Sequence, residues 1–133
     1  MTTALSIAVG EFGRISVLDV DRPVIEHAHP QCHVLLKVDG ADSEFEVGRR
    51  RYPLHDGTAV LVGSWRSHSY PYPPGLRGST ILALYIEPAW LARIDRLFSG
   101  AGRYDFFRRP CAELPMRAAR RLPNRGRARC RAH

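Results

Sequence analysis

The sequence predicts an all-β domain followed by one short helix. Short runs of apolar and β-branched residues alternate with polar residues, which is the period of a strand with one buried face. Turn signals separate these runs roughly every 8–12 residues, as in a sandwich or a small barrel. A helical spacing of apolar residues appears only after Ile86. At 133 residues the chain is long enough for one domain with a buried core.

The predicted strands lie between these turns and cover residues 4–9, 14–20, 24–29, 33–38, 44–48, 49–54, 58–62, 65–72 and 79–86. Asp39-Gly40 and His55-Asp56-Gly57 are strong turn signals. Residues 44–48 alternate strictly, which predicts a half-buried strand that pairs with residues 49–54 across a glycine turn.

A helix is predicted over residues 88–100. Pro88 suits a first helical position, and Gly100 suits the end of a helix. One side of this helix carries an apolar stripe, which consists of Trp90, Leu91, Ile94, Leu97 and Phe98. We expect the stripe to pack on the preceding domain or on a second copy of the chain. A homodimer, formed through this helix or through an exposed strand edge, is therefore predicted.

The net charge of +7 belongs to the end of the chain. Residues 1–100 contain 10 Lys or Arg and 11 Asp or Glu, whereas residues 101–133 contain 10 Arg and two acids. This basic tail loses its apolar periodicity and is expected to be poorly ordered. It is either an arm that neutralises nucleic-acid phosphates or a truncated or out-of-frame end. The lack of aromatic residues after Pro110 favours the second interpretation.

The location of the protein is predicted from what the sequence lacks. No apolar run approaches the roughly 18 residues that span a membrane, and the N-terminus does not resemble a secretory signal. The three cysteines, Cys32, Cys111 and Cys130, are odd in number and have no paired spacing. We therefore expect no disulfide framework and a reducing, cytoplasmic location.

Three of the six histidines lie within seven residues, at His27, His29 and His33. In an extended chain the side chains at i and i+2 point to the same face, about 7 Å apart at the backbone. Pro30 favours an extended conformation for the preceding His29, which supports this geometry. Because imidazole is a common ligand of transition metals, this stretch predicts part of a metal site.

Two motifs extend this prediction. His27-x-His29-x3-His33-x6-Gly40 resembles the first motif of the cupin superfamily, and Gly57-x5-Gly63-x-Trp65-x2-His68 resembles the second. The resemblance covers roughly residues 5–87 and implies a small cupin-type β-barrel over residues 1–87. It also implies a metal site, whose ligands are His27, His29, His33 and His68. The family usually has glutamate at the position of His33, and proline and glycine at Gly63 and Trp65.

The implied cofactor is a divalent transition metal, and neutral imidazoles suit Zn, Ni, Fe or Cu. Without a carboxylate, the set differs from the two-histidine, one-carboxylate site of oxygenases. Three histidines leave one position open for water, whereas four close the site. Cys32 is a further candidate as a soft ligand. The alternative interpretation is that these histidines are structural or exposed residues of a barrel that has lost its metal.

A longer resemblance narrows the family. It runs through Gly40-x-Asp42-Ser43-x-Phe45-x-Val47-Gly48, Leu54-x-Asp56-Gly57, Trp65-x-x-His68-x-Tyr70 and Ile81-Leu82-Ala83-Leu84-Tyr85-Ile86-x-Pro88-x-Trp90-Leu91. These segments are similar to the N-terminal effector-binding domain of AraC-type transcription regulators, which implies a small-molecule effector inside the barrel. No segment after Gly100 has the pattern of that family's helix-turn-helix units, so sequence-specific DNA binding by this chain alone is not expected.

Two further expectations concern the ligand. Aromatic residues near the second motif are expected to line its pocket, because small-molecule pockets are mostly apolar with a few polar groups. These expected ligand-binding residues are Trp65, Tyr70, Tyr72 and Tyr85. Packing in the core is the alternative for each of them. The alternative function to sensing is a stand-alone metal-dependent cupin enzyme of the dioxygenase or isomerase type.

Overall fold

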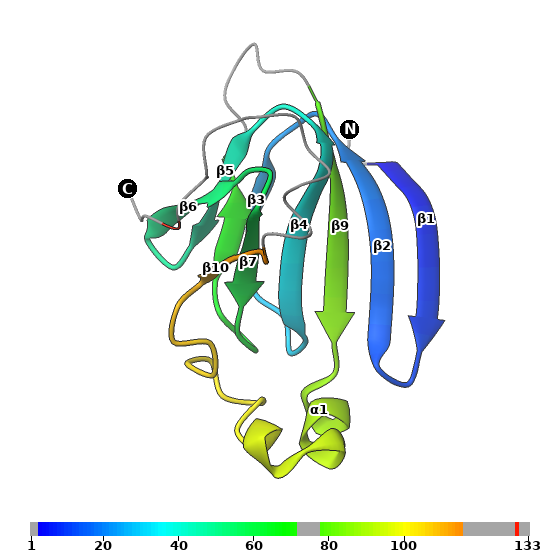
Figure 1. Cartoon of the computed structure of the whole chain (residues 1–133), viewed down its shortest axis with the longest axis vertical. Helices are drawn as coiled ribbons and strands as arrows, with labels where there is room; N and C mark the ends of the chain where they lie inside the picture. Colours follow the sequence, from blue (N-terminus) through cyan, green and yellow to red (C-terminus); the bar gives the residue numbers. More distant parts are fainter. Residues whose placement is uncertain (1–2, 72–77, 116–129, 131–133) are drawn as a thin grey trace.

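The computed structural model describes residues 3–71, 78–115 and 130 of the chain. Within this part, two antiparallel sheets pack against each other (Figure 1). The larger sheet has the order β1 (Thr3–Gly10), β2 (Gly13–Val20), β9 (Ser79–Ile86), β4 (Cys32–Gly40), β7 (Thr58–Val62) and β10 (Cys111–Glu113). The smaller sheet has the order β3 (Val24–His27), β8 (His68–Tyr70), β5 (Ser43–Val47) and β6 (Arg50–Leu54). The predicted all-β class is confirmed.

The predicted hairpin over residues 44–54 is confirmed. In β5 the side chains of Ser43, Phe45 and Val47 are buried, while the two glutamates between them are half-buried. Strand β6 pairs with β5 across Gly48, which has a φ of +63°. Only glycine adopts this left-handed conformation without steric cost, and the tight turn depends on it.

Strand β9 is the centre of the larger sheet and pairs with β2 on one side and β4 on the other (Figure 1). The register places Ala83 between Ser16 and Leu35, and all three are buried. Two residues further along β9, Tyr85 lies between Arg14 and His33. Side chains two residues apart in a strand share a face, so Tyr85 and its neighbours continue the inner face of the sheet beyond the core.

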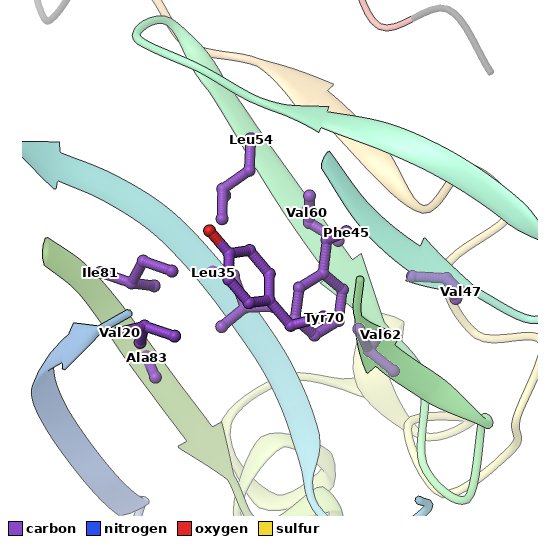
Figure 2. Close-up of a cluster of buried hydrophobic side chains, with 10 residues drawn as sticks. All are labelled: Val20, Leu35, Phe45, Val47, Leu54, Val60, Val62, Tyr70, Ile81 and Ala83. Carbon is purple, nitrogen blue, oxygen red and sulfur yellow. The ribbon is translucent and has the colours of Figure 1, made fainter. Parts of the chain in front are cut away.

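The core lies between the two sheets (Figure 2). The larger sheet contributes Val20, Leu35, Val60, Val62, Ile81 and Ala83, and the smaller contributes Phe45, Val47, Leu54 and Tyr70. Figure 2 shows the rings of Phe45 and Tyr70 side by side in the middle of this layer, with ring centroids 6.1 Å apart. The two sheets are therefore held together by apolar burial, the main favourable term in folding.

Two ion pairs of one buried lysine join the turns near the C-terminal end of β4. The side chain of Lys37 is 3% exposed, and its Nζ lies 2.6 Å from Asp42 and 3.1 Å from Asp56. Burial alone lowers the pKa of Lys37, but the hydrogen bonds to the two aspartates outweigh it and the net pKa is raised. Lys37 is thus held in its charged form between the β4–β5 and β6–β7 turns.

The predicted helix over residues 88–100 is shorter in the structure. Helix α1 covers Pro88–Ile94, and a separate 3-10 turn, η1, covers Arg96–Phe98. Asp95 interrupts them because its backbone is extended, with a φ of −151°, and its carboxylate accepts a hydrogen bond from the Leu97 amide. The helix therefore ends at Asp95 and not at Gly100. No residue of α1 is fully buried, and Leu97 of η1 is 82% exposed, but Trp90 is half-buried and its ring contacts that of Phe12 in the β1–β2 turn, with centroids 6.1 Å apart. The stripe therefore packs on the preceding domain only in part.

The first part of the predicted tail belongs to the fold. Ala101 is fully buried, and β10 pairs with β7 through Cys111 and Val60. Residues 116–129 and 131–133 of the tail lie outside the described residues. The predicted start of the tail at residue 101 is based on the rise in arginine content. Arginine content carries no information on the apolar burial and strand pairing that attach this segment to the fold.

The expectation of no disulfide is wrong, because Cys111 and Cys130 form one with their Cα atoms 5.6 Å apart. Their separation of 19 residues matches no recognised spacing pattern, so the pairing could not be seen in the sequence. The disulfide also removes the argument that the cysteines gave for a reducing compartment. Neither helical segment in the described part of the chain is long and apolar enough to cross a membrane.

Replacement of Leu54 tests the core directly. Leu54 is fully buried between the sheets, so Leu54→Ala should lower the free energy of unfolding by about 2–5 kcal/mol through lost burial and the cavity left behind. The matched control is Leu97→Ala, at a site 82% exposed, which should change stability by no more than about 0.5 kcal/mol. Urea denaturation measures both, and equal effects would contradict this description of the core.

Candidate metal centre

Four histidines gather at the end of the sandwich where β9 leads into α1. His27 is the last residue of β3, His29 lies in the β3–β4 connection, His33 is the second residue of β4, and His68 begins β8. Strands β3 and β8 are neighbours, and the register places His27 directly opposite His68. The antiparallel pairing thus brings together residues that are about 40 positions apart in the sequence.

Three of the four histidines form a compact group. One ring nitrogen from each of His27, His29 and His68 lies within 4.8 Å of the other two. The ring centroid of His68 is 4.3 Å from that of His27 and 4.8 Å from that of His29. His29 is half-buried, His68 is almost fully buried, and His27 is exposed, so the group opens to solvent on one side. Three nearby imidazoles of this kind can hold a metal ion.

A shared hydrogen-bond pattern orients these three rings. The Nδ1 of His27 lies 2.7 Å from the Ile25 carbonyl oxygen, that of His29 lies 3.0 Å from the Gln31 oxygen, and that of His68 lies 2.8 Å from the Arg66 oxygen. Carbonyl oxygens only accept, so each Nδ1 carries the proton and each Nε2 keeps its lone pair. Histidine ligands of metals characteristically donate their other N–H in this way.

The remaining nitrogens fit a ligand role. The Nε2 atoms of His29 and His68 are buried and have no hydrogen-bond partner among the described residues. A buried polar atom without a partner costs free energy, and native proteins usually satisfy it with a group, a water molecule or an ion. A metal ion bound by these Nε2 atoms would remove this cost.

The loop that carries His29 is held by the β7–β8 connection. The Trp65 amide donates to the His29 carbonyl at 2.8 Å, and the Ser64 hydroxyl donates to the Pro30 carbonyl. Trp65 has a φ of +59°, a left-handed conformation that is unfavourable for a bulky residue. Such strain persists only when the surroundings impose it, and it is concentrated at functional sites. The hydrogen-bonded loops hold His29 close to His68.

Burial keeps the inner imidazoles neutral. The pKa of His68 is lowered to about 4, chiefly by burial and to a smaller extent by the neighbouring His27 and His29, while the hydrogen bond to the Arg66 carbonyl opposes the change. The pKa of His33 is well below its usual range, chiefly through burial and then through His68 and His29. Burial also lowers the pKa of His29, with smaller contributions from His27 and Arg14. Neutral imidazole is the form that binds metals, so the site favours a metal over protons.

His33 lies beside this group without joining it. Its ring centroid is 5.2 Å from His29 and 5.4 Å from His68, but its nitrogens lie outside the three-histidine group. Its ring stacks on Tyr85 with centroids 4.2 Å apart, and the guanidinium of Arg14 lies 4.3 Å from the same tyrosine ring. The structure thus places three of the four predicted ligands together and leaves His33 next to them.

The predicted aromatic residues do not form one pocket. Trp65 is 62% exposed, and Tyr70 is a core residue between the sheets. Tyr85 alone borders the histidines, with its ring 5.4 Å from that of His29, and Tyr72 lies outside the described residues. Sequence reasoning missed Arg14. Only the pairing of β2 with β9 places it beside Tyr85, and that pairing leaves no signal in the sequence.

Cys32 is not a ligand of this site. Its thiol is fully buried and donates to the Ala101 carbonyl at 3.3 Å, on the opposite face of β4 from His33. Burial also raises the pKa of the Cys32 thiol, which disfavours the thiolate that metals require.

The donor set fits a divalent transition metal. A tetrahedral zinc ion with Zn–N bonds of 2.0–2.1 Å holds its ligand nitrogens about 3.4 Å apart. The three nitrogens, now within 4.8 Å of one another, would therefore move closer on binding. Three histidines leave the fourth position open for water or a ligand. No protein-family model, curated protein or solved structure matches this chain.

The neutral histidines predict a pH dependence of stability without metal. Their pKa values are lower in the folded protein than in the unfolded chain, where histidine titrates near 6.5. Unfolding therefore takes up protons below about pH 6.5. The stabilisation is complete above that pH and is lost as the pH falls toward 4, so urea denaturation in EDTA should give a lower free energy of unfolding at pH 5 than at pH 7. Replacement His33→Phe should reduce this difference, and equal stability at both pH values would contradict the assignment.

Proposed function

We propose that this chain binds a divalent transition metal at His27, His29 and His68 and uses the bound ion to sense a small molecule. The observation that carries the proposal is the set of three imidazoles whose Nδ1 atoms are engaged by backbone carbonyls. Their Nε2 atoms are thereby left to bind one common metal ion. A structural zinc site usually has four protein ligands, whereas a site with three has one open coordination position at which an external ligand can bind.

The arrangement of the two histidine motifs supports the resemblance to cupins and to AraC-type effector domains. His27 and His29 of the first motif meet His68 of the second, as the resemblance requires. Trp65, at a position where the family usually has glycine, adopts a φ of +59°, which glycine tolerates best. We therefore favour a sensing domain of this kind, which would act in the cytoplasm as a homodimer.

The open position also supports a second candidate, a metal-dependent cupin enzyme. Water bound to a three-histidine zinc ion has a pKa of about 7 and is a competent nucleophile. However, the three-histidine group includes no carboxylate to act as a general base. This difference favours binding of a ligand over turnover. A purified protein that carries no metal and takes up none from solution would exclude both candidates.

Removal of any one ligand should abolish tight metal binding. His27→Ala, His29→Ala and His68→Ala should each weaken zinc affinity by about 100-fold or more, since even removal of a group that only orients a ligand costs 10–100-fold. The control is His55→Ala, because His55 lies outside the three-histidine group. Isothermal titration with Zn²⁺ provides the affinities, and circular dichroism verifies that each variant is folded.

Elemental analysis of untagged protein provides an independent check. About one equivalent of zinc, nickel, iron or copper per chain is expected, and it should fall to background in His68→Ala. If the untagged protein carries no metal and takes up none from solution, the proposal is wrong and the histidines are structural.

A bound effector should depend on the ion. Thermal-shift screening of small molecules should identify compounds that raise the midpoint of the metal-loaded protein, because a ligand that binds only the folded state stabilises it. The same compounds should have no effect after treatment with EDTA. A compound that stabilises both forms equally would show that binding does not involve the metal.

A further inference from the structure

We infer that the small molecule completing this site is a carboxylic acid in its anionic form, held by the metal, by His33 and by Arg14. The inference rests on the proposed metal site and adds the chemical class of its ligand. It follows from three observations: the charge of the site, the unpartnered imidazole of His33, and the row of side chains that leads from His33 to Arg14.

The first observation is that the three-histidine group contains no carboxylate. The three ligands are neutral imidazoles, so a bound divalent ion keeps its full charge of +2. Arg14 adds a further positive charge at the edge of the site, over the ring of Tyr85. Among the described residues Arg14 forms no ion pair within 4.0 Å. Arg14 is itself exposed, so most of the favourable charge would come from the bound ion, and an opposite charge beside that ion is favoured over a neutral ligand.

The acidic side chains nearby are engaged elsewhere. Glu26, next to His27, accepts a hydrogen bond from the Ser67 hydroxyl and is exposed. Glu87 accepts one from the Gln31 amide at 3.0 Å. Neither carboxylate belongs to the three-histidine group. Where the cupin motif usually has glutamate, the chain has His33, so this group contains no carboxylate of its own.

The second observation is His33 itself. It is 4% exposed, and neither of its ring nitrogens has a hydrogen-bond partner among the described residues. A neutral imidazole has one N–H to donate, and a buried donor without an acceptor is unfavourable. The ring lies beside His29 and His68, so its N–H is within reach of a ligand bound to the same metal. A carboxylate supplies two acceptor oxygens, one for the ion and one for this donor.

The third observation is the row formed by β2, β9 and β4. The register sets Arg14, Tyr85 and His33 side by side, with the tyrosine ring between the guanidinium and the imidazole. The backbones of Arg14 and His33 are two strand spacings apart, roughly 9–10 Å. Because His33 and Arg14 cover the two faces of the Tyr85 ring, a ligand that reaches from the metal to Arg14 passes the edge of this ring, and a short acid with a second carboxylate spans this row. Arginine pairs well with a carboxylate through two parallel hydrogen bonds.

Cobalt-loaded protein tests this inference with an optical readout. Co²⁺ is first titrated into the protein and its d–d absorption is recorded, which establishes metal binding without any acid. Succinate is then added, with succinamide as its uncharged counterpart of similar size. Succinate should change the cobalt spectrum in a saturable way, whereas succinamide should not. An equal response to both would overturn the assignment of an anionic ligand, and so would no response to either.

Two variants test the residues. Arg14→Gln and His33→Phe should keep their affinity for Co²⁺ and should bind succinate at least about tenfold more weakly, the size expected for one lost charged contact. The matched control is Arg22→Gln, an exposed arginine that follows the same strand and should leave succinate affinity within about twofold. Equal losses in Arg14→Gln and Arg22→Gln would exclude a specific role for Arg14.

These outcomes separate the two proposals. Cobalt binding without a response to succinate leaves the metal site standing and removes the carboxylate ligand. No cobalt binding by the unmodified chain removes both. Loss of cobalt binding in His33→Phe would instead make His33 a fourth metal ligand, which closes the site and contradicts the inference.

Discussion

The pairing of β9 with β2 and β4 is the constraint on which both the core and the candidate site depend. Along β4, the inner face presents Lys37, Leu35 and His33 in turn, opposite Ile81, Ala83 and Tyr85 of β9. A slip of one residue would turn every one of these side chains to the opposite face. The same register therefore buries Lys37 between two aspartates, places Leu35 in the core and brings His33 to the histidine group.

The histidine group is tolerated because the core beside it is apolar and well packed. Phe45 of the core stacks on His68 with ring centroids 5.8 Å apart, so the imidazole is both desolvated and fixed in orientation. Desolvation disfavours the imidazolium, and the unpartnered Nε2 atoms make the metal-free site costly. Metal binding would recover this cost, which couples the occupancy of the site to the stability of the fold. The desolvated imidazoles and their unpartnered Nε2 atoms destabilise the fold without metal, and the same groups would favour the binding of a metal ion.

Much of the fold could be predicted from local sequence. Alternation and turn residues predict the hairpin at Gly48, the apolar strand β7 and the full extent of β9. The grouping of His27, His29 and His68 was implied by the resemblance to the two cupin motifs, which also implied His33 as a ligand. The features that could not be predicted depend on contacts between distant segments. Cys111 meets Cys130, β10 joins β7, and Arg14 reaches Tyr85 only after the sheets have formed. Asp95 shortened the predicted helix for a different reason, because its side chain accepts a local hydrogen bond from the Leu97 amide, while the apolar stripe packs only in part, through Trp90 against Phe12.

His33 lies at the position where the cupin motif that this stretch resembles has glutamate, and an imidazole there gives the proposed site a different charge from a carboxylate. A carboxylate in that place would bind the ion, neutralise part of its charge and leave less need for an anionic ligand. His33 is instead neutral, almost fully buried and stacked on Tyr85, so it leaves the charge of the ion intact and brings a donor that needs an acceptor. Arg14, on the other side of Tyr85, adds to the same imbalance. His33 and Arg14 thus both favour an anion, and the ligand itself would provide the carboxylate that the three-histidine group lacks.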